Sequence, residues 1–170
     1  MALGSANEAQ KVDILSADGF DTASNAIIEM VFRVSTDSTS AVDFNLGVAS
    51  GTHQSDADSI AEYMFVHLDG DSTNIYVQSE DGTTTVAAAD TTSDYTESEA
   101  ITARVEVWFD LRDPADVQVY VDGVQKLPGS VFDLSAAAGP LYLLAHLEKT
   151  AATAQYMVFV DSLRARFAEQ

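Results

Sequence analysis

Residues 101–123, ITARVEVWFDLRDPADVQVYVDG, constrain the fold more than any other stretch of the chain. Between residues 101 and 111 every odd position is apolar, while the even positions hold Thr, Arg, Glu, Trp and Asp. This period of two is typical of a β-strand with one face on a core. The alternation breaks at residues 112–114, resumes at residues 117–121 and ends at the turn pair Asp122-Gly123. The pattern predicts a β-hairpin.

The predicted hairpin has a defined pairing and two different faces. If its strands turn about Asp113, Val107 lies opposite Val119 on the apolar face. Arg104 then lies opposite Asp122 on the other face. One face therefore belongs to a hydrophobic core, and the other is free for polar contacts or for a second layer of packing.

The rest of the chain repeats this alternation, with turn signals between the segments. Further strands are expected at residues 9–15, 26–34, 42–48, 63–68, 74–78, 83–88, 141–148 and 155–167. Residues 55–62 favour a turn or two of helix, residues 89–99 an exposed loop, and a phase change near Asp161 indicates a bend or bulge. About ten short strands predict an all-β, two-sheet antiparallel jelly-roll sandwich forming a single domain over residues 1–170. Its core is expected to contain Phe32, Val107, Phe109, Val119 and Leu143.

The charge balance excludes several classes of partner. Eight Lys and Arg residues against 27 Asp and Glu residues give a net charge of −19. A free-standing nucleic-acid binder needs the opposite sign, and an anionic membrane surface would repel this chain. The charge either keeps the surface hydrated or steers a basic partner. The chain has no cysteine, which excludes disulfides, and no apolar run of the roughly 20 residues that a membrane span needs.

The hairpin resembles modules of the concanavalin A-like lectin/glucanase superfamily, which includes laminin-G-like and pentraxin-like modules. Those modules often carry a strand with Trp and then a strand ending in Tyr-Val-Asp-Gly, here VEVWFD at residues 105–110 and VQVYVDG at residues 117–123. The segment FVDSLR at residues 159–164 is similar to their closing strand. The opening NEAQKV at residues 7–12 resembles the type of module found in tailed-phage structural proteins. The resemblance implies a jelly-roll fold and leaves function open.

The acidic residues do not form a catalytic pattern. Glucanases of this superfamily use Glu-x-Asp-x-x-Glu on one strand, whereas this chain offers only Glu97-Ser98-Glu99, without the third acid. Glu106 and Asp110 share a strand face but lie about 13 Å apart at roughly 3.3 Å per residue. Glycosidase carboxylates lie about 5 Å or about 6.5–9.5 Å apart. The chain is therefore expected not to be an enzyme.

Metal sites are equally hard to find in the sequence. Residues 69–80 superficially resemble a calcium loop, but Asn74 replaces the required glycine, so a hairpin turn is expected there. His53, His67 and His146 have no metal-binding spacing. If their strands are neighbours, His67 and His146 can meet; otherwise each packs separately. No cofactor is expected, although the resemblance implies calcium as a candidate bound through loop acids.

The other face of the hairpin carries the candidate contact residues, Trp108 and Tyr120. These two aromatic side chains can form a stacking platform for a sugar ring or a contact for a partner. Alternatively, they belong to a second buried face beside which Arg104, Glu106 and Asp122 satisfy one another. The sequence favours the second reading but does not exclude the first.

Three functional readings remain. The phage-like type of module favours a non-enzymatic virion structural protein, a capsid decoration (cement) or fibre-associated module at the virion surface. Such a module binds a major capsid or other virion protein through residues 1–8, 50–58 and 89–99 and forms a homo-oligomer. The alternative is a carbohydrate-binding, lectin-like module that uses Trp108 or Tyr120, with calcium dependence as a further option. A degenerate glycosidase is a third, weaker reading.

Overall fold

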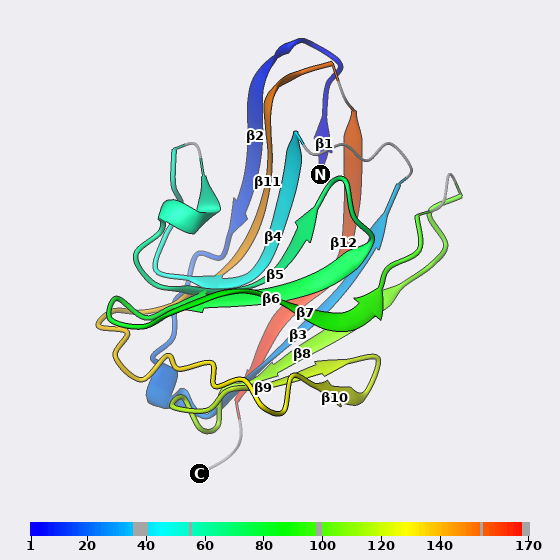
Figure 1. Ribbon diagram of the computed structural model, residues 1–170. Coiled ribbons are helices and arrows are strands. Elements are labelled where there is room, and N and C mark those ends of the chain that lie inside the picture. Colours follow the sequence, from blue (N-terminus) through cyan, green and yellow to red (C-terminus); the bar gives the residue numbers. More distant parts are fainter. Residues whose placement is uncertain (36–40, 55, 98–99, 154, 168–170) are drawn as a thin grey trace.

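A computed structural model describes residues 1–35, 41–54, 56–97, 100–153 and 155–167 (Figure 1). Within these residues the chain forms two antiparallel six-stranded sheets and two short 3-10 helices, η1 (Thr22–Ser24) and η2 (Ala57–Ser59). The first sheet, called the tryptophan sheet here, has the order β1 (Ala2–Leu3), β12 (Tyr156–Phe167), β3 (Ala26–Val34), β8 (Val105–Asp110), β9 (Gln118–Val121), β10 (Val124–Lys126). The second, called the histidine sheet, has the order β2 (Glu8–Leu15), β11 (Tyr142–Ala152), β4 (Val42–Ala49), β5 (Tyr63–Asp69), β6 (Asn74–Glu80), β7 (Thr85–Asp94). The predicted all-β sandwich is confirmed.

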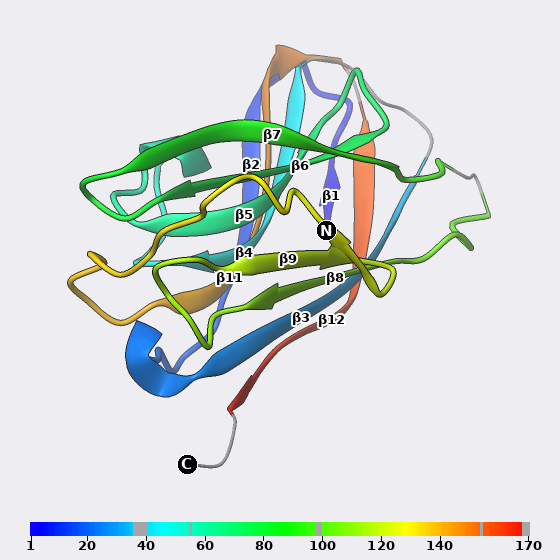
Figure 2. The ribbon, with the colours of Figure 1, turned by 60° about the horizontal axis from the view of Figure 1, so that its bottom comes forward.

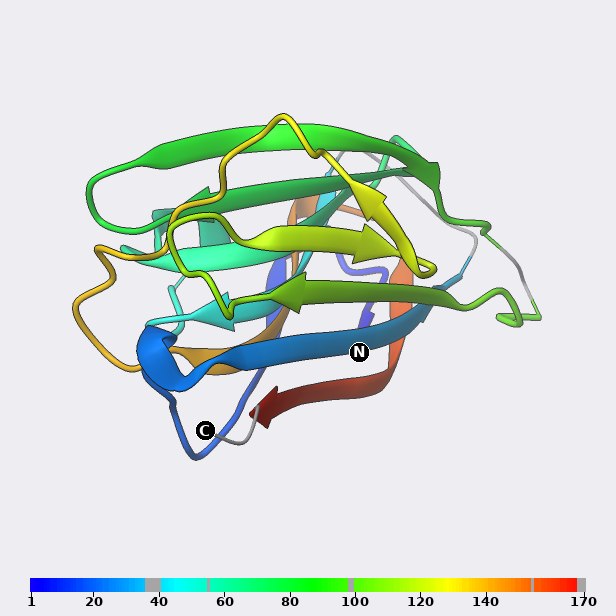
Figure 3. The same cartoon turned by 90° about the horizontal axis from the view of Figure 1, so that it is seen from below.

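The two sheets form two layers around one hydrophobic core. Figures 2 and 3 show β8 and β9 in one layer and β4 to β7 in the other. Phe32 on β3 meets Phe44 on β4 with ring centroids 6.1 Å apart, so aromatic packing joins the layers. No helix among the described residues is long and apolar enough to cross a membrane.

Four of the five predicted core residues are buried. Phe32, Val107 and Phe109 are fully enclosed, and Val119 is 1% exposed. Leu143 is only partly buried, so that expectation is wrong. Its side chain lines a hollow of about 410 Å³ together with residues 16–20 and residues of β12.

The hairpin forms with a different pairing from the predicted one. Phe109, not Val107, lies opposite Val119, and Val107 lies opposite Val121. The centre of the turn therefore lies at Pro114, one residue beyond the predicted centre, which moves every partner by two positions. A shift by an even number keeps each side chain on its predicted face. This explains why the core prediction survives the wrong register.

Three predictions about local structure, a bulge, a loop and a short helix, have different outcomes. The predicted bulge near Asp161 is confirmed, because the pairing of β12 with β3 shifts between Val160 and Ser162. The predicted loop 89–99 is wrong over its first part, since β7 continues to Asp94; residues 98 and 99 lie outside the described ones. The predicted helix shrinks to η2, and residue 55 is likewise outside the described residues.

Candidate functional site

The outer faces of the two sheets carry different sets of side chains. All five arginines of the chain lie on or directly beside the outer face of the tryptophan sheet: Arg33, Arg104, Arg112, Arg164 and Arg166. The outer face of the histidine sheet instead carries histidines, amides and carboxylates, because strand alternation points every second residue away from the core: Asp43, Asn45, His67, Asp69, Asn74, Tyr76, Gln78, His146 and Glu148. The two faces therefore suit different ligands.

A row of paired residues crosses the histidine sheet. His146 on β11 pairs in register with Asn45 on β4, Asn45 with His67 on β5, and His67 with Tyr76 on β6. The two histidines thus share a face but are separated by β4, so they do not meet. Instead, Asn45 lies between them and its Oδ1 is 2.9 Å from Nδ1 of His67.

His146 on β11 is fully buried, and its side chain links β11 to the neighbouring strand β2. Its Nδ1 lies 2.5 Å from an oxygen of Asp13, and its Nε2 lies 2.9 Å from an oxygen of Glu148. Burial works against the charged imidazolium, but the hydrogen bonds with Glu148 and Asp13 outweigh burial and raise the pKa of His146. Because its side chain is enclosed, His146 supports the sheet and does not contact a ligand.

His67 has the opposite electrostatic character. Burial lowers the pKa of His67, against the opposing pull of Asp58 and Asp69, which favours the neutral imidazole. A neutral imidazole can donate one hydrogen bond and accept another. Its ring lies beside Tyr76, with the ring centroids 6.4 Å apart.

The row continues to the sheet edge as a hydrogen-bonded group. The amide of Asn74 donates to the hydroxyl of Tyr76 at 3.0 Å and to a carboxylate oxygen of Asp90 on β7 at 3.3 Å. These three side chains, with His67 and Asp69 of β5, are defined here as the polar strip. All five are at least partly exposed, so they can meet a ligand from solvent.

Residues 50–54 and 56–62 cover the other end of the same face. Lys11 donates to the carbonyl of His53, and Gln78 donates to a carboxylate oxygen of Asp58 at 2.5 Å, so the segment is fixed to both β2 and β6. A small buried apolar cluster lies beneath it: Ala49, Ala57, Ile60, Tyr63, Phe65 and Leu144. Figure 1 shows the strands of the sheet bending around this segment. The described residues of the predicted partner loop 50–58 thus pack on their own sheet. The polar strip forms the open end of a concave face.

Asp43 borders the polar strip and has an unusual carboxyl group. Burial raises the pKa of Asp43 to about 7, and the neighbouring charges of Asp69 and Glu148 add to the effect. Despite these acids, no group of three His, Asp or Glu side chains in the described part of the chain is arranged to hold a metal ion. The suspected calcium loop is a turn at Asp69 followed by β6, as expected for a hairpin.

The raised pKa of Asp43 predicts a pH-dependent stability. The folded chain holds the Asp43 proton more tightly than the unfolded chain, whose carboxyl titrates near about 4. This contribution to stability is full below about pH 4 and is lost as the pH rises through about 7. Asp43→Asn should therefore raise the free energy of unfolding at pH 8 by about 1–2 kcal/mol, after allowing for solvent screening, and change it little at pH 4.

Urea unfolding of wild type and Asp43→Asn at both pH values measures this difference. Asp71→Asn is the matched control, because Asp71 is an exposed aspartate in the nearby turn. An equal gain in the two variants, or no gain in Asp43→Asn, would contradict the assignment.

Trp108 and Tyr120 lie together on the outer face of the tryptophan sheet, as predicted. Both side chains are half-buried, and their ring centroids are 6.4 Å apart. The expected trio beside them forms only in part: the backbone N–H of Glu106 donates to the Asp122 carboxylate at 3.0 Å, whereas Arg104 pairs with Asp161 at 3.0 Å. The Glu106 carboxylate accepts from the indole of Trp108 at 2.8 Å. The pair is therefore neither a second core nor a freely exposed platform.

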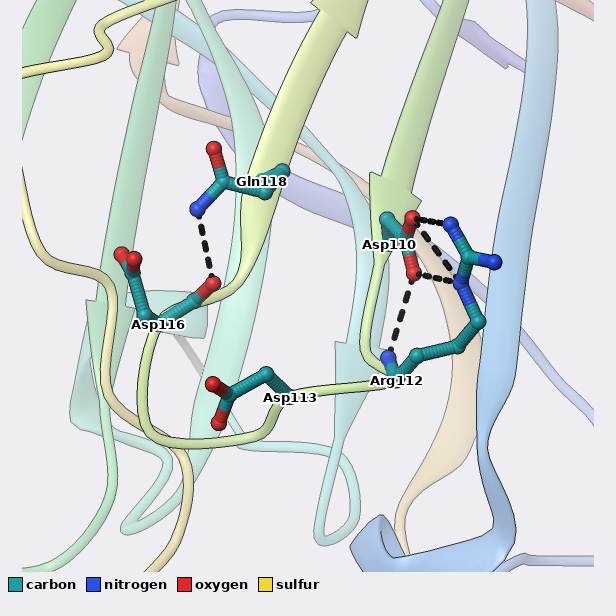
Figure 4. A pocket seen from close by; sticks show the side chains of 5 residues that line it. All are labelled: Asp110, Arg112, Asp113, Asp116 and Gln118. Atoms are coloured by element: carbon teal, nitrogen blue, oxygen red, sulfur yellow. Dashed lines mark hydrogen bonds and ion pairs between the residues drawn. The ribbon is translucent and has the colours of Figure 1, made fainter.

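Glu106 and Asp110, dismissed as a catalytic pair, each have another partner. Glu106 accepts from Trp108, while Arg112 binds the Asp110 carboxylate through two nitrogens, at 2.5 and 2.8 Å (Figure 4). The hydrogen bond from Arg112 outweighs burial and lowers the pKa of Asp110. Both acids thus serve to fix neighbouring side chains.

Asn74 and Tyr76 were not predicted from the sequence to be site residues. Their alternation within the predicted strand 74–78 places both on one face, and this signal was available. What the sequence did not reveal is that β5 and β7 flank this strand with His67 and Asp90 on the same face.

Comparison with known proteins supports a lectin-like architecture. No protein-family model matches the chain, and no curated protein sequence matches it either. Among solved structures, the Emp47p carbohydrate recognition domain has a TM-score of 0.65 at 14% identity, covering 97% of this chain and 82% of that domain. Chicken galectin 2 has a TM-score of 0.55 at 9% identity, covering 91% and 97%. A structure from work on endo-acting O-glycanases of the human gut microbiota has a TM-score of 0.63 at 12% identity, covering 94% and 75%.

These similarities define the class of fold. Two antiparallel six-stranded sheets with these neighbours constitute a concanavalin A-like jelly-roll sandwich. The low identities extend the likeness to the fold alone. The neighbours include lectin domains and proteins that act on glycans, and none of the three is a virion protein by its description.

Proposed function

We propose that this chain is a carbohydrate-binding, lectin-like module whose ligand lies on the polar strip of the histidine sheet. The observation that carries the proposal is the strip itself, five partly exposed hydrogen-bonding side chains at the open end of a concave face. Sugar ligands require convergent donors and acceptors with some apolar surface, held in place before binding. The lectin-like fold neighbours support the same reading.

The strip offers each kind of contact that a sugar needs. Tyr76 provides a ring face and a hydroxyl, and neutral His67 provides a donor and an acceptor. Asp69 and Asp90 accept hydrogen bonds from sugar hydroxyls. The buried Asn45 on the adjacent strand β4 contacts His67 from the side, so that its ring is oriented before the ligand arrives.

The negative charge around the polar strip limits which sugars can bind there. Carboxylates border the strip on several sides, while Lys11 of the same face is engaged with Asp13 and with the carbonyl of His53. A carboxylated or sulfated sugar would be repelled there. The proposed ligand at this face is therefore a neutral or amino sugar within a glycan.

The proposal favours the carbohydrate-binding alternative among the functions derived from the sequence. The comparisons support glycan binding over a capsid role, and attachment to a virion, location at its surface and homo-oligomer formation stay predictions. The module is proposed to bind without turnover. The O-glycanase-related neighbour makes product release worth measuring on any glycan that binds.

A glycan array with the purified protein tests the proposal. We expect binding to one or more neutral or amino-sugar glycans, and a loss of at least about 10-fold in affinity in Tyr76→Ala, because stacking and a hydroxyl contact are removed together. Tyr120→Ala is the matched control, since Tyr120 is also half-buried but lies on the other sheet.

Two results would contradict this site. One is the absence of any glycan binding across the array. The other is a ligand whose affinity is unchanged in Tyr76→Ala although that variant is fully folded by circular dichroism.

A further inference from the structure

The tryptophan sheet, whose outer face carries the arginines, is the layer opposite the histidine sheet with its polar strip (Figure 3). Glu29 on β3 is buried, at 7% exposure, and receives both Arg164 and Arg166. Burial disfavours the charged carboxylate, but the two guanidiniums outweigh burial and lower the pKa of Glu29. Two positive charges thus surround one negative charge, which leaves a local excess of positive charge in a chain that is otherwise strongly acidic.

A hollow of about 310 Å³ opens beside this group. It is lined by three apolar side chains and three charged ones: Ile27, Trp108, Phe167, Glu29, Arg112 and Arg166. Ligand sites are commonly of this kind, apolar with a few convergent polar groups, and range from about 300 to 1,000 Å³. The hollow is at the small end of that range and suits one sugar ring.

The two arginines that line the hollow are oriented by carboxylates at their outer ends. Arg166 donates to Glu29 at 2.8 Å, and Arg112 uses Nε and one terminal nitrogen on Asp110. Figure 4 shows the other terminal nitrogen of Arg112 turned away from Asp110, toward the strand β3. A guanidinium that is already held in place loses less conformational entropy when it binds a ligand.

We propose that this hollow binds a carboxylate-bearing sugar ring, such as a hexuronate, with its carboxylate between Arg112 and Arg166. The apolar face of the ring packs on the indole of Trp108, whose Nε1 is already engaged with Glu106. Guanidiniums match the planar, two-oxygen geometry of a carboxylate better than ammonium groups do. Two further carboxylates lie close to the hollow, but Glu106 is engaged with the Trp108 indole and Asp110 with Arg112. The acidic face of the other sheet has less influence, because charges more than about 8 Å away are screened at physiological salt.

This inference goes beyond the proposed function. The polar strip repels anionic sugars, whereas the hollow selects for them, so one module would hold two sugar classes on opposite faces. Either site can exist without the other, and their tests use different variants.

Glucuronate titrated into ¹⁵N-labelled full-length protein, followed by NMR, tests the proposal. We expect saturable shifts at Trp108 and neighbouring residues with a Kd of about 1 mM or tighter, and at least about 10-fold weaker binding of glucose and of methyl glucuronate ester, which lack the carboxylate charge. Acetate, which lacks the ring, should also bind at least about 10-fold more weakly.

Two variants locate the site, and two others serve as controls. Arg112→Gln and Trp108→Phe should weaken glucuronate binding by about 10-fold and several-fold respectively, with unchanged melting curves as the check on folding. Arg104→Gln is the matched control, because Arg104 also pairs with a carboxylate on this face but does not line the hollow. Tyr76→Ala should leave glucuronate binding intact, which separates this site from the polar strip.

Several outcomes would overturn the proposal. They are no saturable shift with glucuronate, equal binding of glucuronate and glucose, equal binding of glucuronate and acetate, or equal losses in Arg112→Gln and Arg104→Gln.

Discussion

Phe109→Ala should lower the free energy of unfolding by about 3–5 kcal/mol, the range for removing a fully enclosed aromatic side chain. The Phe109 ring on β8 is 0% exposed and reaches across the core to β4. A Cβ atom placed on Gly47 of β4 would lie 3.2 Å from Cε2 of Phe109, so the ring packs directly against the backbone of the other sheet. Truncation therefore leaves a cavity between the layers that the backbone cannot easily close.

Urea unfolding monitored by circular dichroism measures this loss. Val124→Ala is a suitable control, since Val124 is 58% exposed on β10 of the same sheet, and a change within about 0.5 kcal/mol is expected there. A loss below about 1 kcal/mol in Phe109→Ala would mean that the strand presents its other face to the core.

His146→Leu should lower the free energy of unfolding by about 3–5 kcal/mol at pH 6, because it leaves Asp13 and Glu148 without the buried cation between them. The pKa of His146 is raised in the folded chain. Its charge-dependent contribution is therefore full below the unfolded pKa of about 6.5 and is lost as the pH rises through the folded pKa. The difference between wild type and variant should shrink at pH 9.

His67→Leu is the matched comparison, because the pKa of His67 moves in the opposite direction. Its effect should not shrink between pH 6 and pH 9, since the folded chain favours the neutral ring throughout. Urea unfolding measures the pH profile of each variant. Parallel profiles would show that the interaction of His146 with Asp13 and Glu148 is not ionic.

The strand pattern of this chain could be predicted because most core strands alternate cleanly. The segment 26–34 was predicted with the same limits as β3, and the bulge near Asp161 was visible as a change of phase. The edge strand β7 was partly missed, since its Thr, Ala and Asp residues resemble a loop. Its pairing depends on contacts such as the hydroxyl of Thr91, which donates to the carbonyl of Ile75. Those contacts are made with the neighbouring strand β6, so the sequence of β7 alone does not reveal them.

The hairpin register shows a different limit of sequence reasoning. The faces of Trp108 and Tyr120 follow from alternation, which is local information. The centre of the turn depends on how the residues around Asp113 and Pro114 fold, and an error of one residue there shifts all partners by two. Alternation cannot detect such an even shift.

The candidate site depends on strand order, which local patterns do not contain. His67 and Tyr76 come from strands adjacent in sequence, so their contact could have been anticipated. Asn45 lies between His67 and His146 only because β4 is inserted between β5 and β11. The clustering of the arginines on one sheet has the same origin, since β3, β8 and β12 bring together arginines that lie far apart along the chain.

The most direct test of the account is to map a bound sugar on the protein. A neutral or amino-sugar glycan selected on the array should be titrated into ¹⁵N-labelled protein and followed by NMR. Saturable shifts centred on His67, Asn74 and Tyr76, with little change at Trp108 or Tyr120, are the predicted result. Shifts centred on the tryptophan sheet with none on the polar strip would contradict the central claim that the concave face of the histidine sheet binds the glycan.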